Sequence, residues 1–232
     1  KPEIVFHLAA QALVRDSYDD PKKTFDTNIG GTVNILEAVR LSSSVKAALV
    51  ITSDKCYENK EWVWGYREND PMGGHDPYSA SKGGAEIVCS AYRRSFFDKA
   101  GCGPHIGFAT VRAGNVIGGG DWAKDRIIPD CIRALSENKP IVIRNPKATR
   151  PWQHVLEPLS GYLFLARKLL DDTDKFSGAW NFGPADIEHI KVEELAKRFV
   201  AVWGKGAIER NEPNEPAPHE ANLLRLSIDK AA

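Results

Sequence analysis

The chain has 232 residues, which is enough for one large domain or two small ones with a sizeable core. Lysine plus arginine equals aspartate plus glutamate, at 31 each, and this balance argues against nucleic acid or an anionic membrane surface as a partner. No apolar run reaches the roughly 18 residues that suggest a membrane-spanning helix. The four cysteines are widely spaced, without a CxxC pair or a Cys-His cluster. This pattern favours reduced thiols in the cytoplasm over a disulfide framework or a metal site.

The first part of the chain alternates between buried strands and helices. Residues 4–10 form a continuous apolar run, typical of a strand buried on both faces. Apolar side chains recur at helical spacing in residues 28–41, and residues 46–53 indicate a second buried strand. A helix is expected to begin near Tyr78, after Pro77, and a third strand to cover residues 107–118. This rhythm predicts a parallel α/β sheet with right-handed crossovers.

Polar residues follow each of the predicted strands. They are Gln11 and Arg15 after the first strand, Ser53, Asp54 and Lys55 after the second, and Asn115 after the third. In parallel sheets, ligands bind beyond the carboxyl ends of the strands. We therefore expect these side chains to face one crevice.

The pattern changes after residue 118. Helices are expected over 127–138, 156–172 and 191–203, and short strands near 141–143 and 179–183. Gly204 is the expected C-cap of the last helix. The proline-rich residues 211–220 should form a loop.

Tyr78 and Lys82 lie four residues apart at the start of the predicted central helix. Side chains at this spacing share a helix face, and an ammonium near a phenol lowers the phenol pKa from its usual value of about 10. Such a tyrosine could take a proton from a sugar hydroxyl near neutral pH. Taken alone, the spacing is more often a solvated pair than a site.

Ser53 strengthens the case for a site because it leaves a buried strand across the expected crevice from Tyr78. There it could hydrogen-bond the same substrate oxygen that Tyr78 deprotonates. The strand-end serine, the YxxxK helix and "HLAA" at residues 7–10 together resemble the extended short-chain dehydrogenase/reductase family. The resemblance implies a Rossmann-like doubly wound parallel sheet, bound NAD, a nucleotide-sugar substrate and a homo-oligomer.

Within this family, the residues after the strand-end serine are similar to those of the nucleotide-sugar 4,6-dehydratases. Long motifs at residues 66–82, 112–130 and 144–163 are most similar to dehydratases that act on CDP-glucose. The resemblance implies a reaction that feeds deoxysugar and O-antigen synthesis. The resemblance implies that Tyr78 deprotonates the sugar 4-hydroxyl while hydride leaves C4. Asp54 is then the acid that protonates the departing 6-hydroxyl, after which hydride returns to C6.

Lys55 departs from the pattern, since related dehydratases commonly carry a glutamate there as the base at C5. A lysine can act as a base only when it is neutral, which requires burial or neighbouring cations to lower its pKa. Alternatively, Lys55 stays charged and stabilises the enolate while another group removes the proton. A third interpretation is an exposed lysine in a turn.

Further cofactor and substrate residues follow from the resemblance. Leu8, Ala9 and Ala10 would line the cofactor groove, and Asn28 would support the cofactor or cap a helix. Tyr78 and Lys82 would also contact the cofactor. The substrate residues implied are Asn115, Arg126, Arg150 and His219. The arginines offer bidentate donors to phosphate oxygens, although each could instead form a surface salt bridge.

The family's glycine-rich turn and the acidic residue at its second strand do not occur in this sequence, so the chain is expected to be an internal segment that lacks the N-terminal half of the sheet. The expected division is 1–118 and 155–183 for the Rossmann part, and 119–154 and 184–232 for an interleaved, smaller substrate-binding part. One alternative is another nucleotide-sugar epimerase or decarboxylase, although the pair Asp54 and Lys55 argues against an epimerase. Another alternative is a non-catalytic dinucleotide-binding sensor.

Overall fold

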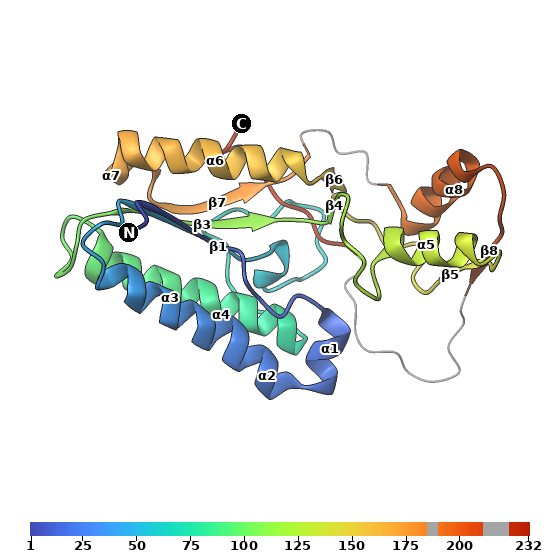
Figure 1. Cartoon of the computed structure of the whole chain (residues 1–232), viewed down its shortest axis with the longest axis horizontal. Coiled ribbons are helices and arrows are strands. Elements are labelled where there is room, and N and C mark those ends of the chain that lie inside the picture. Colours follow the sequence, from blue (N-terminus) through green and yellow to red (C-terminus); the bar gives the residue numbers. More distant parts are fainter. Residues whose placement is uncertain (185–189, 211–222) are drawn as a thin grey trace.

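The computed structural model describes residues 1–184, 190–210 and 223–232. Its centre is a sheet of the strands β1 (Ile4–His7), β2 (Ala47–Ile51), β3 (Gly107–Ala113) and β7 (Gly178–Phe182). The strand order is β1-β2-β3-β7, and every neighbouring pair is parallel (Figure 1). The carboxyl ends of the strands therefore meet at one edge, as the alternation of strands and helices predicts.

Helices cover both faces of this sheet. They are α3 (Gly31–Arg40) and α4 (Pro77–Tyr92) on one face and α6 (Leu156–Asp171) on the other (Figure 1). The first core cluster includes Leu36 and Phe108, and the second includes Leu49 and Leu165. β2 and β3 contribute to both clusters, which explains why their sequences are apolar without alternation.

Short elements connect the strands to the helices. They are α1 (Val14–Asp19), α2 (Pro21–Phe25), the π-helical turns η1 (Asp26–Gly30) and η3 (Arg93–Phe97), the 3-10 helix η2 (Asp54–Cys56) and α7 (Thr173–Phe176). The two short helices α1 and α2 lie between β1 and η1, in a stretch for which the sequence predicts no helix.

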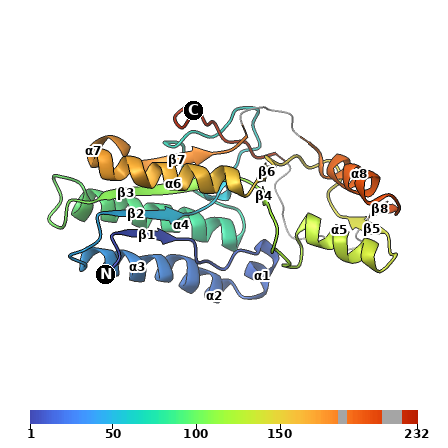
Figure 2. The ribbon, with the colours of Figure 1, turned by 45° about the horizontal axis from the view of Figure 1, so that its top comes forward.

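A second, smaller group of elements lies beyond the end of the sheet (Figure 2). It contains α5 (Ile127–Ser136), β5 (Ile141–Ile143), α8 (Val192–Trp203) and β8 (Ile208–Arg210). Leu135, Ile141 and Ala196 are buried in a core of its own. Gly204 has a φ of 89° at the end of α8, which confirms it as the C-cap.

The strand predicted over residues 107–118 is interrupted at Gly114. The chain leaves β3 there and forms β4 (Val116–Ile117), which pairs in parallel with β6 (Gln153–His154). A Cβ on Gly114 would lie 2.4 Å from Cγ of Pro151, so only glycine permits this close approach. Asn115 follows this break, and its backbone carbonyl accepts from the N–H of Gln153 in β6 at 3.0 Å.

In the described part of the chain, the helices are too short or too polar to cross a bilayer. The four cysteines are free thiols, and Cys102 is exposed while the others are buried.

Candidate active site

A cavity of about 530 Å³ lies at the carboxyl ends of β2 and β3. The predicted catalytic and substrate residues that line it are Ser53, Asp54, Lys55, Tyr78, Asn115, Arg126 and Arg150. They come from both the sheet and the smaller group of elements, so the cavity lies where these two parts of the structure meet.

Ser53 connects the two predicted proton-transfer groups. Its hydroxyl donates to the Asp54 carboxylate at 2.9 Å, and Ser53 acts to lower the pKa of the Tyr78 phenol, which lines the same cavity. Ser53 also caps η2, because its Oγ accepts from the backbone N–H of Lys55 at 3.2 Å. One strand-end serine therefore fixes the turn that carries Asp54 and Lys55 and reaches the tyrosine of the next helix.

The start of α4 fixes Tyr78 in the first helical turn. Asp76 is the N-cap, accepting from the backbone N–H of Ser79 at 2.9 Å, and Pro77 follows at the first helical position. The backbone N–H of Tyr78 donates to Oγ of Ser17 at 3.1 Å. These contacts aim the phenol at the end of β2.

The expectation that Lys82 lowers the pKa of Tyr78 is wrong for this structure. Burial raises the pKa of Tyr78 to about 12, and this effect exceeds the opposing hydrogen bond from Ser53 and the nearby charge of Arg126. Lys82 points instead to the carbonyl of Ile51, to which its Nζ donates at 3.4 Å. Desolvation outweighs charge pairing because both side chains are almost completely buried.

The pKa of Lys82 is also shifted by burial. Burial lowers its pKa from 10.5 to about 8. The charge of Lys82 acts with burial to lower the pKa of His7, the last residue of β1. The lysine and the histidine therefore share a desolvated region between α4 and the sheet.

Burial of Asp54 favours the protonated form of its side chain. It is 4% exposed, and burial raises its pKa, against the charges of Lys55 and Arg150 and the hydrogen bond from Ser53. Lys55 is half-buried on the same 3-10 turn. An acid and a cation thus lie side by side at the cavity wall.

Of the predicted cofactor residues, Tyr78 lines this cavity, whereas Leu8, Ala9 and Ala10 follow β1 and do not line it. Leu8 is 54% exposed, Ala9 is exposed and Ala10 is half-buried. Asn28 is buried in η1 and does not cap a helix. Its side chain accepts from the backbone N–H of Gln11 and donates to Oγ of Ser81 on α4, at 2.8 Å each.

Asn28 therefore holds the loop after β1 against the helix that carries Tyr78. Gln11 also donates through Nε2 to the hydroxyl of Thr24 at 2.9 Å. The loop that follows the exposed strand end is fixed by these contacts.

Arg126 and Arg150 approach the cavity from the smaller group of elements. Nη2 of Arg126 donates to the carbonyl of Ala12 at 3.4 Å, while its buried Nε has no hydrogen-bond partner in the described structure. Nη1 of Arg150 donates to the carbonyl of Thr149 at 2.9 Å, and its charge acts on Asp54. His219 lies outside the described residues.

A further charged cluster at this cavity was not predicted as a unit. Asp125 pairs with Arg144 and, at 3.7 Å, with Arg15. All three line the cavity, but Arg15 precedes the sheet's second strand whereas Asp125 and Arg144 belong to the smaller group of elements. Their separation in the chain leaves no motif from which to predict the cluster.

With this geometry established, comparison with known proteins assigns the family. The profile of the NAD dependent epimerase/dehydratase family matches residues 1–182. The chain therefore belongs to that family, and its fold is Rossmann-like.

Two curated relatives refine the comparison. The chain is 57% identical over its whole length to the CDP-glucose 4,6-dehydratase of Salmonella typhimurium, of which it covers 64%. It is 30% identical over 222 residues, 84% of the chain, to the CDP-paratose 2-epimerase of Salmonella typhi, of which it covers 62%. The chain thus spans less than two thirds of the length of these relatives.

Solved structures show the same fold at lower identity. The UDP-glucuronic acid 4-epimerase of Bacillus cereus, in complex with UDP-glucuronic acid and NAD, matches with a TM-score of 0.80, 22% identity and coverage of 99% of this chain and 68% of that one. The dTDP-glucose 4,6-dehydratase of Bacillus anthracis, in complex with NAD, matches with a TM-score of 0.77, 19% identity and coverage of 99% and 64%.

Proposed function

We propose that the whole protein is an NAD-dependent nucleotide-sugar 4,6-dehydratase that converts CDP-glucose to CDP-4-keto-6-deoxyglucose. The observation that carries this proposal is the convergence of Tyr78, Ser53 and Asp54 at one cavity, where the Ser53 hydroxyl donates to Asp54 and acts to lower the pKa of Tyr78. The identity of 57% to a CDP-glucose 4,6-dehydratase supports this choice of reaction and nucleotide.

The first proton transfer is assigned to Tyr78. As the base at the 4-hydroxyl it must exist as phenolate during the step, and the Ser53 hydroxyl and the Arg126 charge both favour that form. Lys82 contributes a group whose pKa of about 8 allows either protonation state near neutral pH. Ser53 additionally orients the sugar oxygen.

The elimination step is assigned to the two residues of η2 that line the cavity. Asp54 donates a proton to the departing 6-hydroxyl, a role that its raised pKa supports. Lys55 either removes the C5 proton as a neutral amine or stabilises the enolate as a cation. Both roles require that its side chain reach the bound hexose from the cavity wall, and the role of base requires in addition that its pKa be lowered.

NAD fits the end of β1. When bound it supplies hydride acceptance from C4 and hydride return to C6. Leu8 and Ala9 leave an exposed strand end where a flat ligand can approach the backbone. Nζ of Lys82 has a single long hydrogen bond within the described residues, so its other N–H donors remain available to hydroxyl groups.

The nucleotide diphosphate is assigned to Arg126, Arg150 and Asn115, with His219 as a further proposed contact. Arg126 supports this assignment best, because it lines the cavity and its buried Nε lacks a hydrogen-bond partner within the described residues. Residues 1–118 and 155–183 would then form the NAD-binding part, and 119–154 with 184–232 the substrate-binding part.

We also expect the protein to act in the cytoplasm as a homo-oligomer. The buried free thiols of Cys56, Cys89 and Cys131 suit a reducing compartment. Light scattering coupled to gel filtration of the full-length protein would test the oligomer directly.

The proposal is tested by incubating the full-length protein and NAD separately with CDP-glucose and dTDP-glucose labelled with deuterium at C4. We expect a 4-keto-6-deoxy product from CDP-glucose, with the deuterium transferred to C6. An epimerase would instead return a hexose that retains its 6-hydroxyl. Binding of NAD without turnover of either sugar would identify a sensor, and either outcome overturns the dehydratase assignment.

A further inference from the structure

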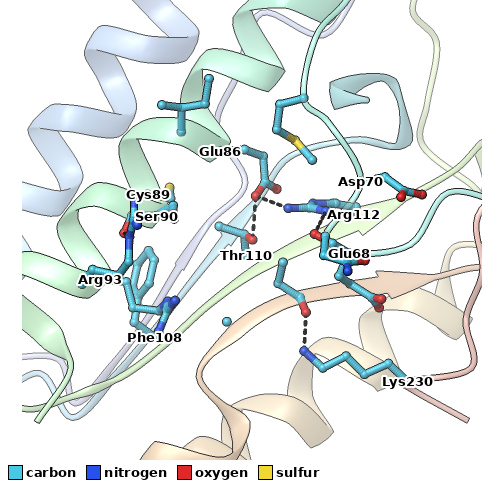
Figure 3. A pocket seen from close by; sticks show the side chains of 16 residues that line it. Glu68, Asp70, Glu86, Cys89, Ser90, Arg93, Phe108, Thr110, Arg112 and Lys230 are labelled. Carbon is cyan, nitrogen blue, oxygen red and sulfur yellow. Dashed lines mark hydrogen bonds and ion pairs between the residues drawn. The ribbon is translucent and has the colours of Figure 1, made fainter. Parts of the chain in front are cut away.

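A buried ion pair lies directly behind the candidate active site. The carboxylate of Glu86, on α4, accepts from Nη2 of Arg112, on β3, at 2.7 Å, and both side chains are at most 4% exposed (Figure 3). The pair forms part of the wall of a second cavity, of about 410 Å³, which the proposed chemistry does not use.

The ion pair accepts or donates hydrogen bonds on both sides of residues 53–56, the catalytic turn that carries Ser53 and Asp54. On one side, Thr52 donates its hydroxyl to Glu86 immediately before Ser53. On the other, Nη1 of Arg112 donates to the phenol oxygen of Tyr57 at 2.6 Å, immediately after η2. Tyr57 in turn donates to Oδ1 of Asn181 on β7 at 2.7 Å.

Glu86 lies on α4, the helix that also carries the proposed base Tyr78. Glu86 follows Lys82 by one helical turn, and Lys82 donates to the carbonyl of Ile51, the residue before Thr52. Two successive turns of α4 thus contact two successive residues at the end of β2. The backbone of Gly83 between them packs close to the carbonyl of Cys56 in η2.

Stability alone does not account for an ion pair at this depth. Replacing a buried ion pair by packed apolar side chains is often neutral or stabilising, because desolvation offsets the attraction between the charges. A fixed set of directional hydrogen bonds, in contrast, can specify one relative position of two elements. Here those elements are the turn with Ser53 and Asp54 and the helix with Tyr78.

We propose that Glu86 and Arg112 are positioning residues that set the register of the turn 53–56 against α4, and so the distance at which Ser53 and Asp54 meet the Tyr78 side chain. Neither residue lines the active-site cavity, so their effect on the reaction passes through Thr52 and Tyr57. This inference rests on the proposed dehydratase function for its kinetic consequences only.

The test compares two threonines that donate to the same carboxylate. Thr52 donates to one oxygen of Glu86 beside the catalytic turn, whereas Thr110 donates to the other oxygen at 2.8 Å from within β3. In the full-length protein, Thr52→Val and Thr110→Val each replace one buried hydroxyl by a methyl group and keep the shape of the side chain. We expect similar losses of melting temperature from the two variants.

Their kinetics should differ. Displacing a catalytic group can lower the rate of a reaction by about 100-fold. We therefore expect Thr52→Val to lower kcat by roughly 10- to 100-fold, with KM within about threefold of the parent value. Thr52→Ser, which restores the hydroxyl, should recover most of kcat, while Thr110→Val stays within about threefold of the parent protein. Equal kcat losses in the two valine variants, or no recovery in Thr52→Ser, would overturn the positioning role.

A second measurement separates this inference from the proposed reaction. Hydrogen exchange followed by mass spectrometry should show faster exchange of residues 53–57 in Thr52→Val than in Thr110→Val, because the N–H of Cys56 donates to the carbonyl of Ser53 within that turn. Exchange does not depend on the substrate. Faster exchange without any turnover of CDP-glucose by the parent protein would reject the dehydratase and retain the positioning role, whereas equal exchange in both variants would reject positioning.

Discussion

Ser53 and Tyr78 line one cavity, although Ser53 caps η2 after β2 and Tyr78 lies in the first turn of α4. The Ser53 hydroxyl donates to Asp54 and acts to lower the pKa of Tyr78. Ser53 thus lies between two groups whose pKa values burial raises, a phenol and a carboxylic acid. The proposed dehydratase reaction needs a base at one sugar position and an acid at another, and both of these groups line the same cavity.

Tyr78→Phe should remove the base while leaving the fold intact. We expect kcat to fall by about 10²- to 10⁴-fold, the usual contribution of a general base, with little change in nucleotide-sugar affinity. Tyr92→Phe is the control, because Tyr92, at the end of α4, donates to Glu37 on α3 and neither residue lines the cavity. NAD reduction at the parent rate by Tyr78→Phe would mean that another group takes the proton.

Lys55→Ala should separate the two halves of the reaction. Oxidation at C4 depends on Tyr78, so a rise in absorbance from reduced NAD should remain detectable, while the 4-keto-6-deoxy product should be absent. The physical reason is that Lys55 shares η2 with Asp54, at the part of the cavity assigned to elimination. Full turnover by this variant would contradict the role of Lys55.

Asp54→Asn should stabilise the protein while stopping elimination. Burial raises the folded pKa of Asp54, so above that pKa the fold carries a buried carboxylate at a cost to stability. The amide removes this cost and keeps an oxygen that can accept from Ser53. We expect a higher melting temperature at pH 7 and no gain below the ordinary pKa of 3.8, where the acid is protonated in both folded and unfolded chains.

Lys82→Met should change how stability depends on pH. The folded pKa of Lys82 is about 8 and the ordinary value is 10.5, so between these values the unfolded chain binds the extra proton and stability rises with pH. The shift corresponds to about 3 kcal/mol. The advantage of Lys82→Met in free energy of unfolding should be largest below pH 8 and shrink by about that amount by pH 10.5.

Denaturant titrations of both proteins from pH 6 to pH 10 measure this directly. A parallel pH dependence of the two proteins would show that the lysine is not desolvated in the fold.

Adjacent glycines of α4 should respond differently to alanine. A Cβ on Gly83 would lie 2.7 Å from the backbone oxygen of Gly73 and 3.1 Å from that of Cys56, and neither atom can move without shifting the catalytic turn. We expect Gly83→Ala to lower the free energy of unfolding by about 1–3 kcal/mol and to lower kcat.

Gly84→Ala is the matched control. Its Cβ would lie 2.5 Å from Cδ1 of Ile29, the end of a flexible side chain, and alanine favours a helix by about 1 kcal/mol over glycine. Its stability should therefore stay within about 1 kcal/mol of the parent protein. Equal effects of the two substitutions in thermal melts would contradict the close packing of α4 on η2.

Much of the fold follows from local patterns in the sequence. The continuous apolar runs of β2 and β3 indicate strands buried on both faces, and Pro77 after Asp76 predicts the start of α4. Ser53 and Tyr78 could be paired in advance because a strand end and the next helix start meet at one edge of a parallel sheet. These relationships depend on short-range periodicity and on a single topological rule.

Other features depend on contacts that no local pattern contains. Asp125 meets Arg15 and Arg144 only because the smaller group of elements docks at the end of the sheet. The pKa of Tyr78 is a sum of burial, one hydrogen bond and several charges from distant segments, and spacing alone predicts the wrong direction. Periodicity reports which face of an element is apolar, whereas desolvation and ion pairing depend on what the complete fold places against that face.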